Sequence, residues 1–439
     1  MKASITDLVA NGLCTGCGIC TSESAGALEM KWNEDGFLIP VHNGQKYDME
    51  RTVKLCPFNP SPDDSIKDED VLSLKYLKDT TQYDDRVGRF LNTYVGYSNQ
   101  FRSTSSSGGI ATYVFKQLLI LNIVDYIYIV KEDNGSYSYQ LFNNIEEIES
   151  VSKTRYIPVT MESLFKQINC LDGKIGISGV ACFVKAIRLK QHYHPDLYQK
   201  IPFLVGIICG GWKSSFFSDF LSQTAGIQNE YSEQEYRIKD PKSLASDYSY
   251  GAKDDLGNFH SIKMAKVGDM WGTGLFKSRA CDFCTDVMTE LADISLGDAW
   301  LPEYRNDGLG NNIIVTRSKM ADLIISNGIS SGELKVSFIS TGKIIQSQLP
   351  SFAHRQDAIK FRLNISNFKG HLTPYIRKRV LKSISLAYSL VQIQRERTRY
   401  RSFKYWKESK NSNVFIDKIN FDLKLLKYLT KIYHRLRNL

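Results

Sequence analysis

The stretch KIGISGVACFVKAI, residues 174–187, combines a strand and a helix within fourteen residues. Its first five residues, KIGIS, are short, apolar and β-branched, which is typical of a buried strand. A Gly-x-x-Cys turn follows, and a helix is expected over residues 183–193. Strands that alternate with helices build α/β layer structures, so this stretch predicts an α/β fold.

The same alternation continues on both sides of this stretch. Residues 108–122, GGIATYVFKQLLILN, predict a helix with Ile110, Val114, Leu118 and Leu119 on one apolar face. Further strands are predicted at 123–130, 203–208 and 312–317, and a helical segment is predicted from Ser214. Residues 227–275 are polar and aromatic without a clear period, and they predict only an insertion or a lid.

Composition divides the chain into four parts, an overall α+β/α/β arrangement. Residues 1–60 carry clustered cysteines and predict a small ferredoxin-like module of the 4Fe-4S type. Residues 61–90 include the polar, acidic stretch PSPDDSIKDED and predict a linker. The larger α/β domain covers residues 91–373, and residues 374–439 form a basic tail with helical propensity.

The chain has 439 residues, of which nine are cysteines and 42% are hydrophobic. Its N-terminus, MKASITDLVANGLC, lacks the apolar core and the cleavage site of a signal peptide. No run of about 18 apolar residues predicts a membrane span. We therefore expect a cytoplasmic protein, in which clustered cysteines indicate metal ligands rather than disulfides.

The first cysteine set has the spacing of an iron–sulfur ligand loop. Cys14, Cys17 and Cys20 form a Cys-x2-Cys-x2-Cys loop, and Cys56 precedes Pro57. Such a loop surrounds three corners of a cubane cluster and cannot reach the fourth iron, so Cys56 is the candidate for the fourth thiolate. Thiolates are soft donors that suit iron.

Two glycines, Gly16 and Gly18, are expected to let this loop turn and to aim amide N–H groups at the cluster's sulfurs. The alternatives are a zinc knuckle and a set of unliganded thiols, although zinc sites usually use pairs of Cys-x2-Cys rather than three cysteines in a row. No second triplet precedes Cys56, so the module is expected to hold one cluster.

A second cysteine set is spread over three loops. Cys182 and Cys209 each follow a predicted strand, and Cys281 and Cys284 form a Cys-x2-Cys pair. In an open α/β sheet, the loops after neighbouring strands lie at the carboxyl edge, where ligands bind. The four thiols could hold a second 4Fe-4S cluster. Alternatively, Cys182 and Cys209 are small core residues.

The turn Ser105-Ser106-Ser107-Gly108-Gly109 opens the helix predicted after it. Backbone N–H groups and hydroxyls at such a start favour anions, so a nucleotide or flavin phosphate could bind there. The alternative is an ordinary helix cap, in which serine and glycine are common.

Several segments, taken in order, resemble the coenzyme F420 hydrogenase/dehydrogenase beta-subunit family. The matching segments are CTGCGIC (14–20), NEDGFLIP (33–40), STSSSGGIAT (103–112), KIGISGVACFVKAI (174–187), LVGIICGG (204–211), and RACDFC with ADISLGDAW (279–300). The resemblance spans roughly residues 10–320. It implies a flavoprotein with one or more 4Fe-4S clusters, in which FAD lies beside the serine–glycine turn and a second cluster lies close to the flavin.

The resemblance also assigns a role to Arg155 in KTRYIP, which matches a stretch with a basic residue near the flavin. Such a residue would stabilise the negative charge of reduced flavin, whereas the alternative is a surface arginine. Two departures leave the flavin contacts and the substrate open. The family's Gly-x-Pro-Cys is replaced here by residues 179–182, GVAC, and its Cys-His by Cys209-Gly210.

The basic tail is distinct from the rest of the chain. From Arg377 to Leu439 there are 17 Lys or Arg and 4 Asp or Glu, which leaves the remaining residues mildly acidic. With Trp406 at the interface, this tail could lie on an anionic membrane surface; the alternative is a solvated basic helix packed on the body. No nucleic acid partner is expected. The tail also resembles family members associated with bacterial surface-polysaccharide synthesis.

Three further residues are candidates for the site or the core. Asp293 and Asp298 could form an acid/base pair. The favoured interpretation is a strand and a turn, with Asp298 capping the segment that follows. Cys170 ends an apolar, helix-like stretch and is expected in the core.

Together, these features predict a redox enzyme in which 4Fe-4S clusters exchange electrons with FAD to oxidise or reduce a small organic substrate. A deazaflavin coenzyme, a polysaccharide intermediate or a redox protein would be the partner. The competing hypothesis is a non-catalytic electron-transfer or scaffold subunit that serves a separate enzyme.

Overall fold

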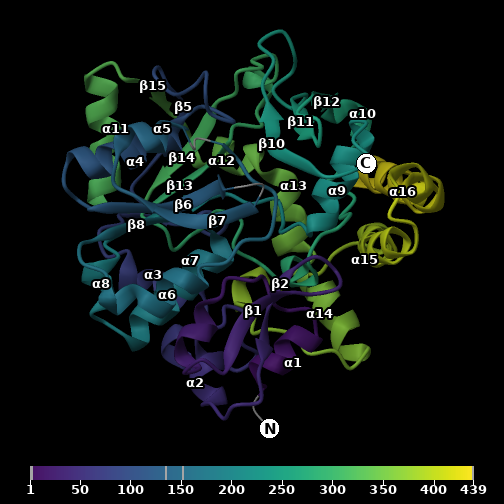
Figure 1. Cartoon of the computed structure of the whole chain (residues 1–439), viewed down its shortest axis with the longest axis horizontal. Coiled ribbons are helices and arrows are strands. Elements are labelled where there is room, and N and C mark those ends of the chain that lie inside the picture. The colour runs from purple at the N-terminus through teal and green to yellow at the C-terminus, as the bar shows by residue number, and fades with distance from the viewer. Residues whose placement is uncertain (1–2, 134–135, 151–152, 438–439) are drawn as a thin grey trace.

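The computed structural model describes residues 3–133, 136–150 and 153–437. At the centre of this part of the chain is an eight-stranded mixed sheet in the order β15-β5-β14-β13-β9-β8-β6-β7 (Figure 1). Its strands are β5 (Asn92–Ser98), β6 (Tyr126–Asp133), β7 (Ser136–Phe142), β8 (Ile175–Val180), β9 (Phe203–Ile207), β13 (Ile294–Asp298), β14 (Asn312–Thr316) and β15 (Leu334–Phe338).

The four middle strands β6, β8, β9 and β13 run parallel, and the outer strands pair antiparallel. The predicted strands at 123–130, 174–178, 203–208 and 312–317 are all present. One detail differs: no separate turn follows KIGIS, because β8 continues through Val180 and helix α7 (Ala181–Tyr193) begins at the next residue. Cys182 therefore lies in the first turn of a helix.

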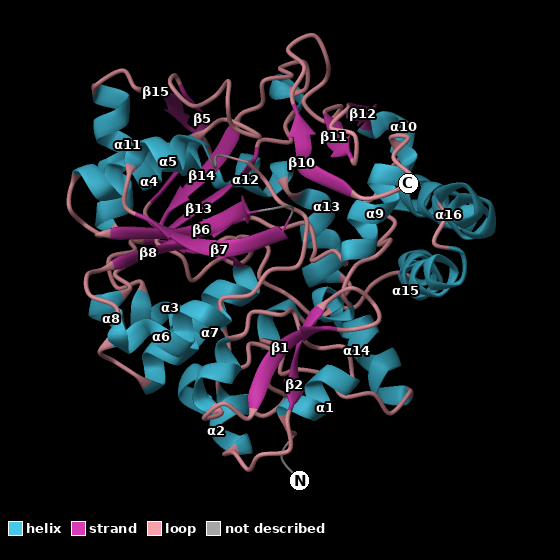
Figure 2. Ribbon diagram, in the orientation of Figure 1, coloured by secondary structure: helices cyan, strands magenta, loops and turns pink. Residues whose placement is uncertain are grey.

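Helices cover both faces of the sheet (Figure 2). Helices α4 (Ile110–Ile120), α5 (Ile145–Ser150) and α11 (Lys319–Ser330) pack on one face. Helices α3 (Glu69–Tyr76), α6 (Glu162–Gln167), α7 and α8 (Leu197–Lys200) pack on the other. The predicted apolar face of α4 is confirmed, because Ile110, Val114 and Leu118 are fully buried in the first of these layers.

The N-terminal cysteine module lies below the sheet in the view of Figure 1. It consists of α1 (Ile5–Ala10), the 3-10 turn η1 (Ile19–Glu23), the hairpin β1 (Leu28–Trp32) with β2 (Leu38–His42), and α2 (Met49–Lys54). Its buried residues form a core with Phe283 and Ile359 from distant parts of the chain. The module therefore packs directly on the loops that carry the second cysteine set.

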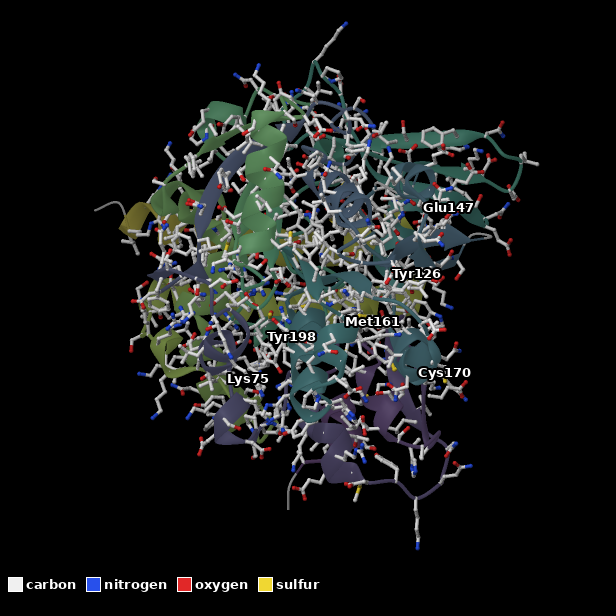
Figure 3. The ribbon with its side chains drawn as sticks, turned by 90° about the vertical axis from the view of Figure 1, so that its left-hand side faces the viewer. Lys75, Tyr126, Glu147, Met161, Cys170 and Tyr198 are labelled. Atoms are coloured by element: carbon white, nitrogen blue, oxygen red, sulfur yellow. The ribbon has the colours of Figure 1, made fainter. Side chains whose placement is uncertain are left out.

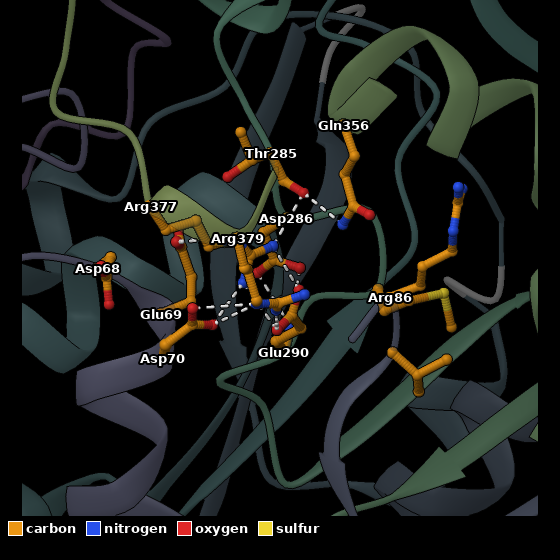
Figure 4. A network of polar contacts seen from close by, with 12 residues as sticks. Asp68, Glu69, Asp70, Arg86, Thr285, Asp286, Glu290, Gln356, Arg377 and Arg379 are labelled. Carbon is orange, nitrogen blue, oxygen red and sulfur yellow. Dashed lines mark hydrogen bonds and ion pairs between the residues drawn. The ribbon is translucent and has the colours of Figure 1, made fainter. Parts of the chain in front are cut away.

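Residues 61–90, which the sequence predicted as a linker, contain regular secondary structure. They form η2 (Asp64–Ile66), α3 and the small hairpin β3 (Gln82–Asp84) with β4 (Gly88–Phe90). Two of the acidic residues of this stretch, Glu69 and Asp70, belong to an ion network with Arg377, whereas Asp63 and Asp64 are exposed (Figure 4). Arg377 lies within 3.1 Å of Asp70 and forms two hydrogen bonds to Glu290, at 2.9 and 2.6 Å.

The polar segment 227–275 forms a second, three-stranded antiparallel sheet. Its strands β10 (Tyr231–Ile238), β11 (Ser249–Asp254) and β12 (Phe259–Lys263) are followed by the short helix α10 (Met264–Val267) and preceded by α9 (Ser215–Thr224). Buried tyrosines, including Tyr236 and Tyr250, pack this sheet on α9. The hydroxyls of Tyr236 and Tyr250 form hydrogen bonds with Ser218 and Ser222 of α9, so these polar groups are satisfied inside the packed layer.

The C-terminal part is helical, with α12 (Thr341–Ser347), α13 (Leu349–Phe352), the π-helical turn η6 (Ala353–Asp357), α14 (Ile359–Phe368), α15 (Leu386–Ser409) and α16 (Ser412–Arg437). Helices α15 and α16 lie side by side at one end of the molecule (Figure 1). No helix within the described ranges has both the length and the apolar character that crossing a bilayer requires.

Trp406 is not at an interface with solvent or lipid. It is 2% exposed and packs among Phe220, Phe276 and Phe415, with ring centroids 5.6 to 6.0 Å away. The aromatic residues of α15 anchor the tail to the body instead. The structure therefore agrees with the alternative interpretation, in which the tail is a basic helix packed on the body.

Candidate functional site

The loop of the first cysteine set turns at two glycines, as predicted. Gly16 and Gly18 have φ angles of 79° and 78°, which L side chains rarely adopt. A Cβ at Gly16 would lie 2.8 Å from the carbonyl oxygen of Leu38, so only glycine fits there. The Gly16 amide lies 3.3 Å from Sγ of Cys14, so a backbone N–H group of this loop approaches a cysteine sulfur.

Cys56 lies beside this loop, so the first set contains all four predicted thiols. Burial raises the pKa of Cys14 to about 12 and that of Cys17 to about 11. Burial also raises the pKa of Cys20 well above its usual value, and the neighbouring thiols of Cys17, Cys14 and Cys56 add to this shift. Four thiols this close do not readily all ionise by themselves, and a bound metal cation would favour their ionised forms.

An apolar cavity of about 30 Å³ lies against these thiols. Besides the four cysteines it is lined mainly by apolar side chains, including Ile5, Leu8, Val9, Leu13, Pro40, Leu55 and Phe58. Such a lining excludes water from the sulfurs, which is one of the factors that set the potential of an iron–sulfur cluster.

The second set also comes together, from three loops. Cys182 follows β8 and Cys209 follows β9 at the same edge of the sheet, while Cys281 lies in the turn η4 (Arg279–Asp282). Burial raises the pKa of Cys182 well above its usual value, and the thiols of Cys284, Cys281 and Cys209 raise it further. The predicted convergence at the carboxyl edge is therefore present, and these two cysteines are more than isolated core residues.

Backbone amides approach this set as they approach the first. The Gly211 amide lies 3.3 Å from Sγ of Cys209, and the Trp212 amide lies 3.1 Å from Sγ of Cys281. A guanidinium that the sequence did not indicate, that of Arg355, donates to Sγ of Cys284 at 2.7 Å. Arg355 is 71 residues away in a helical segment, so no local motif could have predicted it.

The two cysteine sets adjoin each other. A hydrogen bond with the side chain of Thr15, next to Cys14, lowers the pKa of Cys182 against the effect of burial. A second cavity, of about 20 Å³, is lined by Cys182 and Cys284, and it shares Pro57 and Phe58 with the cavity of the first set. The residues after Cys56 therefore separate the two sets.

The serine–glycine turn precedes α4 as predicted, and Gly109, with φ 79°, is its N-cap. A Cβ at Gly108 would lie 2.7 Å from the carbonyl oxygen of Gly96, so the turn packs closely on β5. Some of its polar groups already have protein partners. The Ile110 amide lies 3.3 Å from Oδ1 of Asn312, and Ser107 Oγ donates to the carbonyl of Asn311 at 3.2 Å.

Ser105 and Ser106 are buried, and Ser106 connects the turn to the segment that carries Arg155. Its Oγ accepts a hydrogen bond from the Thr154 amide at 2.8 Å. Arg155 is half-buried rather than on the surface, its guanidinium lies 5.5 Å from the ring centroid of Tyr137, and its Nε is buried without a hydrogen-bond partner. Burial lowers the pKa of Arg155.

Two cations beside the turn were missed by sequence reasoning. Lys239 Nζ donates to the carbonyls of Ser107 and Leu309 at 2.9 and 3.1 Å. Arg237 pairs with Asp298, with Nη1 2.6 Å from Oδ2. Both cations lie at or just after the end of β10, in the segment that the sequence left unassigned, so only the fold brings them to this turn.

Aromatic side chains lie between the turn and the second cysteine set. The ring centroid of Tyr156 is 4.8 Å from that of Trp271. Trp271 lies against Gly210, where an added Cβ would come within 3.2 Å of the indole. Thr154 and Tyr156 are two residues apart in the chain, so at most about 7 Å separates their Cα atoms.

Asp293 and Asp298 do not form an acid/base pair. Asp293 is buried and pairs with Arg188, 3.2 Å away. Asp298 ends β13, as the strand-and-turn interpretation predicted, although its carboxylate binds Arg237 and it is its carbonyl that accepts from Ser347 and Gln348. Neither carboxylate is thus available as a general base.

Cys170 is exposed, so its predicted place in the core is wrong (Figure 3). It ends the 3-10 turn η3 (Ile168–Cys170), and it is Ile168 that is buried.

Within the described ranges, no three His, Cys, Asp or Glu side chains are placed to hold one metal ion. A 4Fe-4S cluster spaces its thiolates more widely than a single ion does, so the fit must be judged from the cysteine sets themselves.

The comparisons with known proteins agree with the order of these elements. Two family models match, both described as "Coenzyme F420 hydrogenase/dehydrogenase, beta subunit". The model of the N-terminal part matches residues 93–166, and the model of the C-terminal part matches residues 172–341. Together they cover more than half of the chain. The chain belongs to the coenzyme F420 hydrogenase/dehydrogenase beta-subunit family.

Individual relatives are distant. The coenzyme F420 hydrogenase subunit beta of Methanosarcina barkeri is 24% identical over 249 residues, covering 52% of this chain and 74% of that protein. The coenzyme F420-dependent sulfite reductase of Methanocaldococcus jannaschii is 23% identical over 335 residues, covering 73% of this chain and 46% of that protein. Both relatives are named for redox reactions, so family membership supports a redox, electron-transfer role.

One solved structure supports the fold. A chain of the F420-reducing [NiFe] hydrogenase complex from Methanosarcina barkeri superimposes with a TM-score of 0.51 at 21% identity. The match covers 67% of this chain and all of that chain. At this identity the likeness concerns the fold alone, the mixed α/β arrangement around one large sheet.

Proposed function

We propose that this member of the family is an iron–sulfur flavoprotein oxidoreductase with two 4Fe-4S clusters and one FAD. Cys14, Cys17, Cys20 and Cys56 would hold the first cluster, and the second cysteine set would hold the second. The observation that carries the proposal is that eight of the nine cysteines, all half-buried or buried, gather into two adjoining sets, whereas Cys170 lies apart on the surface.

The donors fit iron–sulfur clusters well. Each set offers four thiols, backbone amides within 3.3 Å of sulfur, and a setting that buries the sulfurs. When bound, the clusters exchange single electrons and the flavin combines two such electrons into one step on an organic substrate. The chain itself excludes water from the sulfurs and holds Tyr156 and Trp271 between the second set and the serine–glycine turn.

The flavin is proposed to bind at the serine–glycine turn. The turn and the cations Arg155, Arg237 and Lys239 offer positive charge to a phosphate, and Nε of both arginines is buried without a partner. The names of the relatives suggest a deazaflavin coenzyme as the substrate. A surface-polysaccharide intermediate remains the other proposed substrate, on the resemblance of the basic tail alone.

Anaerobic purification of the full chain, with iron, zinc and flavin counts and an absorption spectrum, tests this function. About eight irons and one flavin per chain are expected. About four irons would reduce the proposal to one cluster, and zinc without iron would reject it.

The second candidate function is an electron-transfer subunit that serves a separate enzyme. It is favoured by the relatives' description as a subunit and by the match to one chain of a hydrogenase complex. An isolated chain that holds clusters and flavin yet shows no turnover with a deazaflavin would support it. Turnover by the isolated chain would reject it.

A further inference from the structure

Arg355 is a buried arginine whose guanidinium faces the second cysteine set. Its Nη2 donates to Sγ of Cys284 at 2.7 Å, its Nη1 to the carbonyl of Cys209 at 2.8 Å, and its Nε to the carbonyl of Cys284 at 3.0 Å. The residue is only 6% exposed. One side chain thus binds two of the three loops that form the set.

No carboxylate in the described part of the chain forms an ion pair with Arg355. Within the described part of the chain its hydrogen-bond partners are carbonyl oxygens and one sulfur, and it forms no ion pair with Asp or Glu. Asp286 lies beside it but offers its backbone carbonyl. Arginine stays protonated in proteins, and a buried charge without a counter-charge costs several kcal/mol. The Cys284 and Cys209 thiols act on Arg355 more strongly than the Asp286 carboxylate does, so the cysteine set is its main counter-charge.

The other cations around this set differ from Arg355. Lys277 is paired with Asp282 at 2.7 Å, so its charge is already balanced. Lys213 donates to the carbonyl of Met270 at 2.7 Å, and burial lowers its pKa to about 7, so it loses its charge readily. Of these three, only Arg355 combines a permanent charge with the absence of an acidic partner.

The first cysteine set lacks such a contact. Among the described residues, no arginine or lysine nitrogen forms a hydrogen bond with the sulfurs of Cys14, Cys17, Cys20 or Cys56, and the adjoining cavity is lined mainly by apolar side chains. The two sets thus offer similar ligands in different electrostatic surroundings.

Arg355 also comes from outside the part of the chain that defines the family. The family models end at residue 341, whereas Arg355 lies in the π-helical turn η6. Such turns widen a helix locally and often occur at functional sites. The C-terminal helices thus contribute a charge to a set whose ligands all lie earlier in the chain.

We propose that Arg355 is a positioning residue that holds the second cysteine set in its anionic, cluster-binding form and raises the reduction potential of that cluster. The inference rests on the proposed function, since it requires a cluster at this set. Reduction adds one electron, taken from a reductant such as dithionite, and one negative charge to the cluster, and no covalent bond changes. Hydrogen bonds to sulfur and nearby positive charge favour the reduced form.

The test is an anaerobic dithionite titration of the iron-loaded full chain, followed by electron paramagnetic resonance. Arg355→Gln removes the positive charge. Arg355→Lys keeps the positive charge but lacks the planar guanidinium and its set of hydrogen-bond donors. Arg362→Gln is the matched control, because Arg362 is also buried and donates to Asp282 and Gln392 rather than to a cysteine.

We expect Arg355→Gln to shift one of two midpoint potentials to a more negative value, leaving the other unchanged. Arg362→Gln should shift neither. If Arg355→Gln loads only about four irons, Arg355→Lys is measured instead, and a negative shift of one midpoint supports the inference. If the loaded Arg355 variant holds about eight irons and neither midpoint potential changes, the inference about Arg355 is overturned and the proposed function still stands. About four irons in the unmodified chain overturns the proposed second cluster and the inference together.

Discussion

The Thr154 amide donates a hydrogen bond to Oγ of Ser106 at 2.8 Å, across 48 residues of chain. This contact fixes the segment that carries Arg155 against the serine–glycine turn. Two residues further on, the ring of Tyr156 lies against Trp271, beside the loop of Cys209. One short segment therefore connects the proposed flavin site with the second cysteine set.

Ser106→Ala should weaken flavin binding by about tenfold, because losing a buried hydrogen bond of this kind costs about 1 to 1.5 kcal/mol and frees Arg155 to move. Flavin affinity is measured by fluorescence quenching on the iron-loaded chain. Ser103→Ala, at an exposed position in the same loop, is the control. Equal affinities for the two variants would show that the turn does not bind flavin.

The charge of Lys239 is expected to make flavin affinity depend on pH. Burial lowers its pKa to about 8, and the nearby charges of Arg102 and Arg237 add to the shift. Because the protonated amine is the charged form, the positive charge beside the turn is lost as the pH rises through about 8. Flavin affinity should therefore fall between about pH 7 and pH 9. Lys239→Gln should bind flavin weakly at every pH in this range, whereas Lys242→Gln, at an exposed site nearby, should keep the dependence. An unchanged pH profile in Lys239→Gln would contradict this role.

The sequence predicted the features that are local. Strands β8 and β9 are short apolar runs, and the rule that ligands gather at the carboxyl edge was enough to bring Cys182 and Cys209 together. Contacts between distant segments could not be read in this way. Asp70 looked solvated because its partner, Arg377, lies about 300 residues further along the chain. Arg355 and Trp406 were missed or misplaced for the same reason, since helix packing decides what each side chain faces.

The two cysteine sets should be separable by mutation. Cys56→Ser should lower the iron content by about four per chain and leave the second cluster's signal, and Cys182→Ser should do the converse. Cys170→Ser, at an exposed thiol, should change neither count. Iron assay with electron paramagnetic resonance measures this. Loss of all iron in both single variants would instead indicate that the two sets assemble as one unit.

Arg377→Met should destabilise the protein by about 3 to 5 kcal/mol. The substitution removes two hydrogen bonds from Glu290, which is 2% exposed, and leaves Arg379 as its ion-pair partner beside Asp70 (Figure 4). Urea unfolding at fixed pH measures the change. Arg397→Met is the control, because Arg397 is about half exposed where it approaches Asp422 and such pairs contribute less than about 1 kcal/mol. A loss below about 1 kcal/mol in Arg377→Met would show that the network does not hold residues 61–90 in place.

The outer face of α16 is the part of the tail that still suits an anionic membrane surface. Phe421 and Tyr428 are 65% and 62% exposed, and Lys424, Lys427 and Lys431 are exposed on the same helix. Each lysine near an anionic bilayer contributes about 1 kcal/mol. Replacing all three with glutamine should therefore weaken sedimentation with phosphatidylglycerol vesicles by more than tenfold.

The matched control replaces three exposed lysines elsewhere, Lys46, Lys266 and Lys335, so that the net charge changes equally. If both triple variants lose vesicle binding to the same extent, the attraction comes from net charge and not from α16. If the unmodified chain sediments equally with phosphatidylcholine vesicles, charge is not what recognises the surface. Binding that requires both anionic lipid and the three lysines of α16 would place the membrane contact on this helix, on the side away from the buried Trp406.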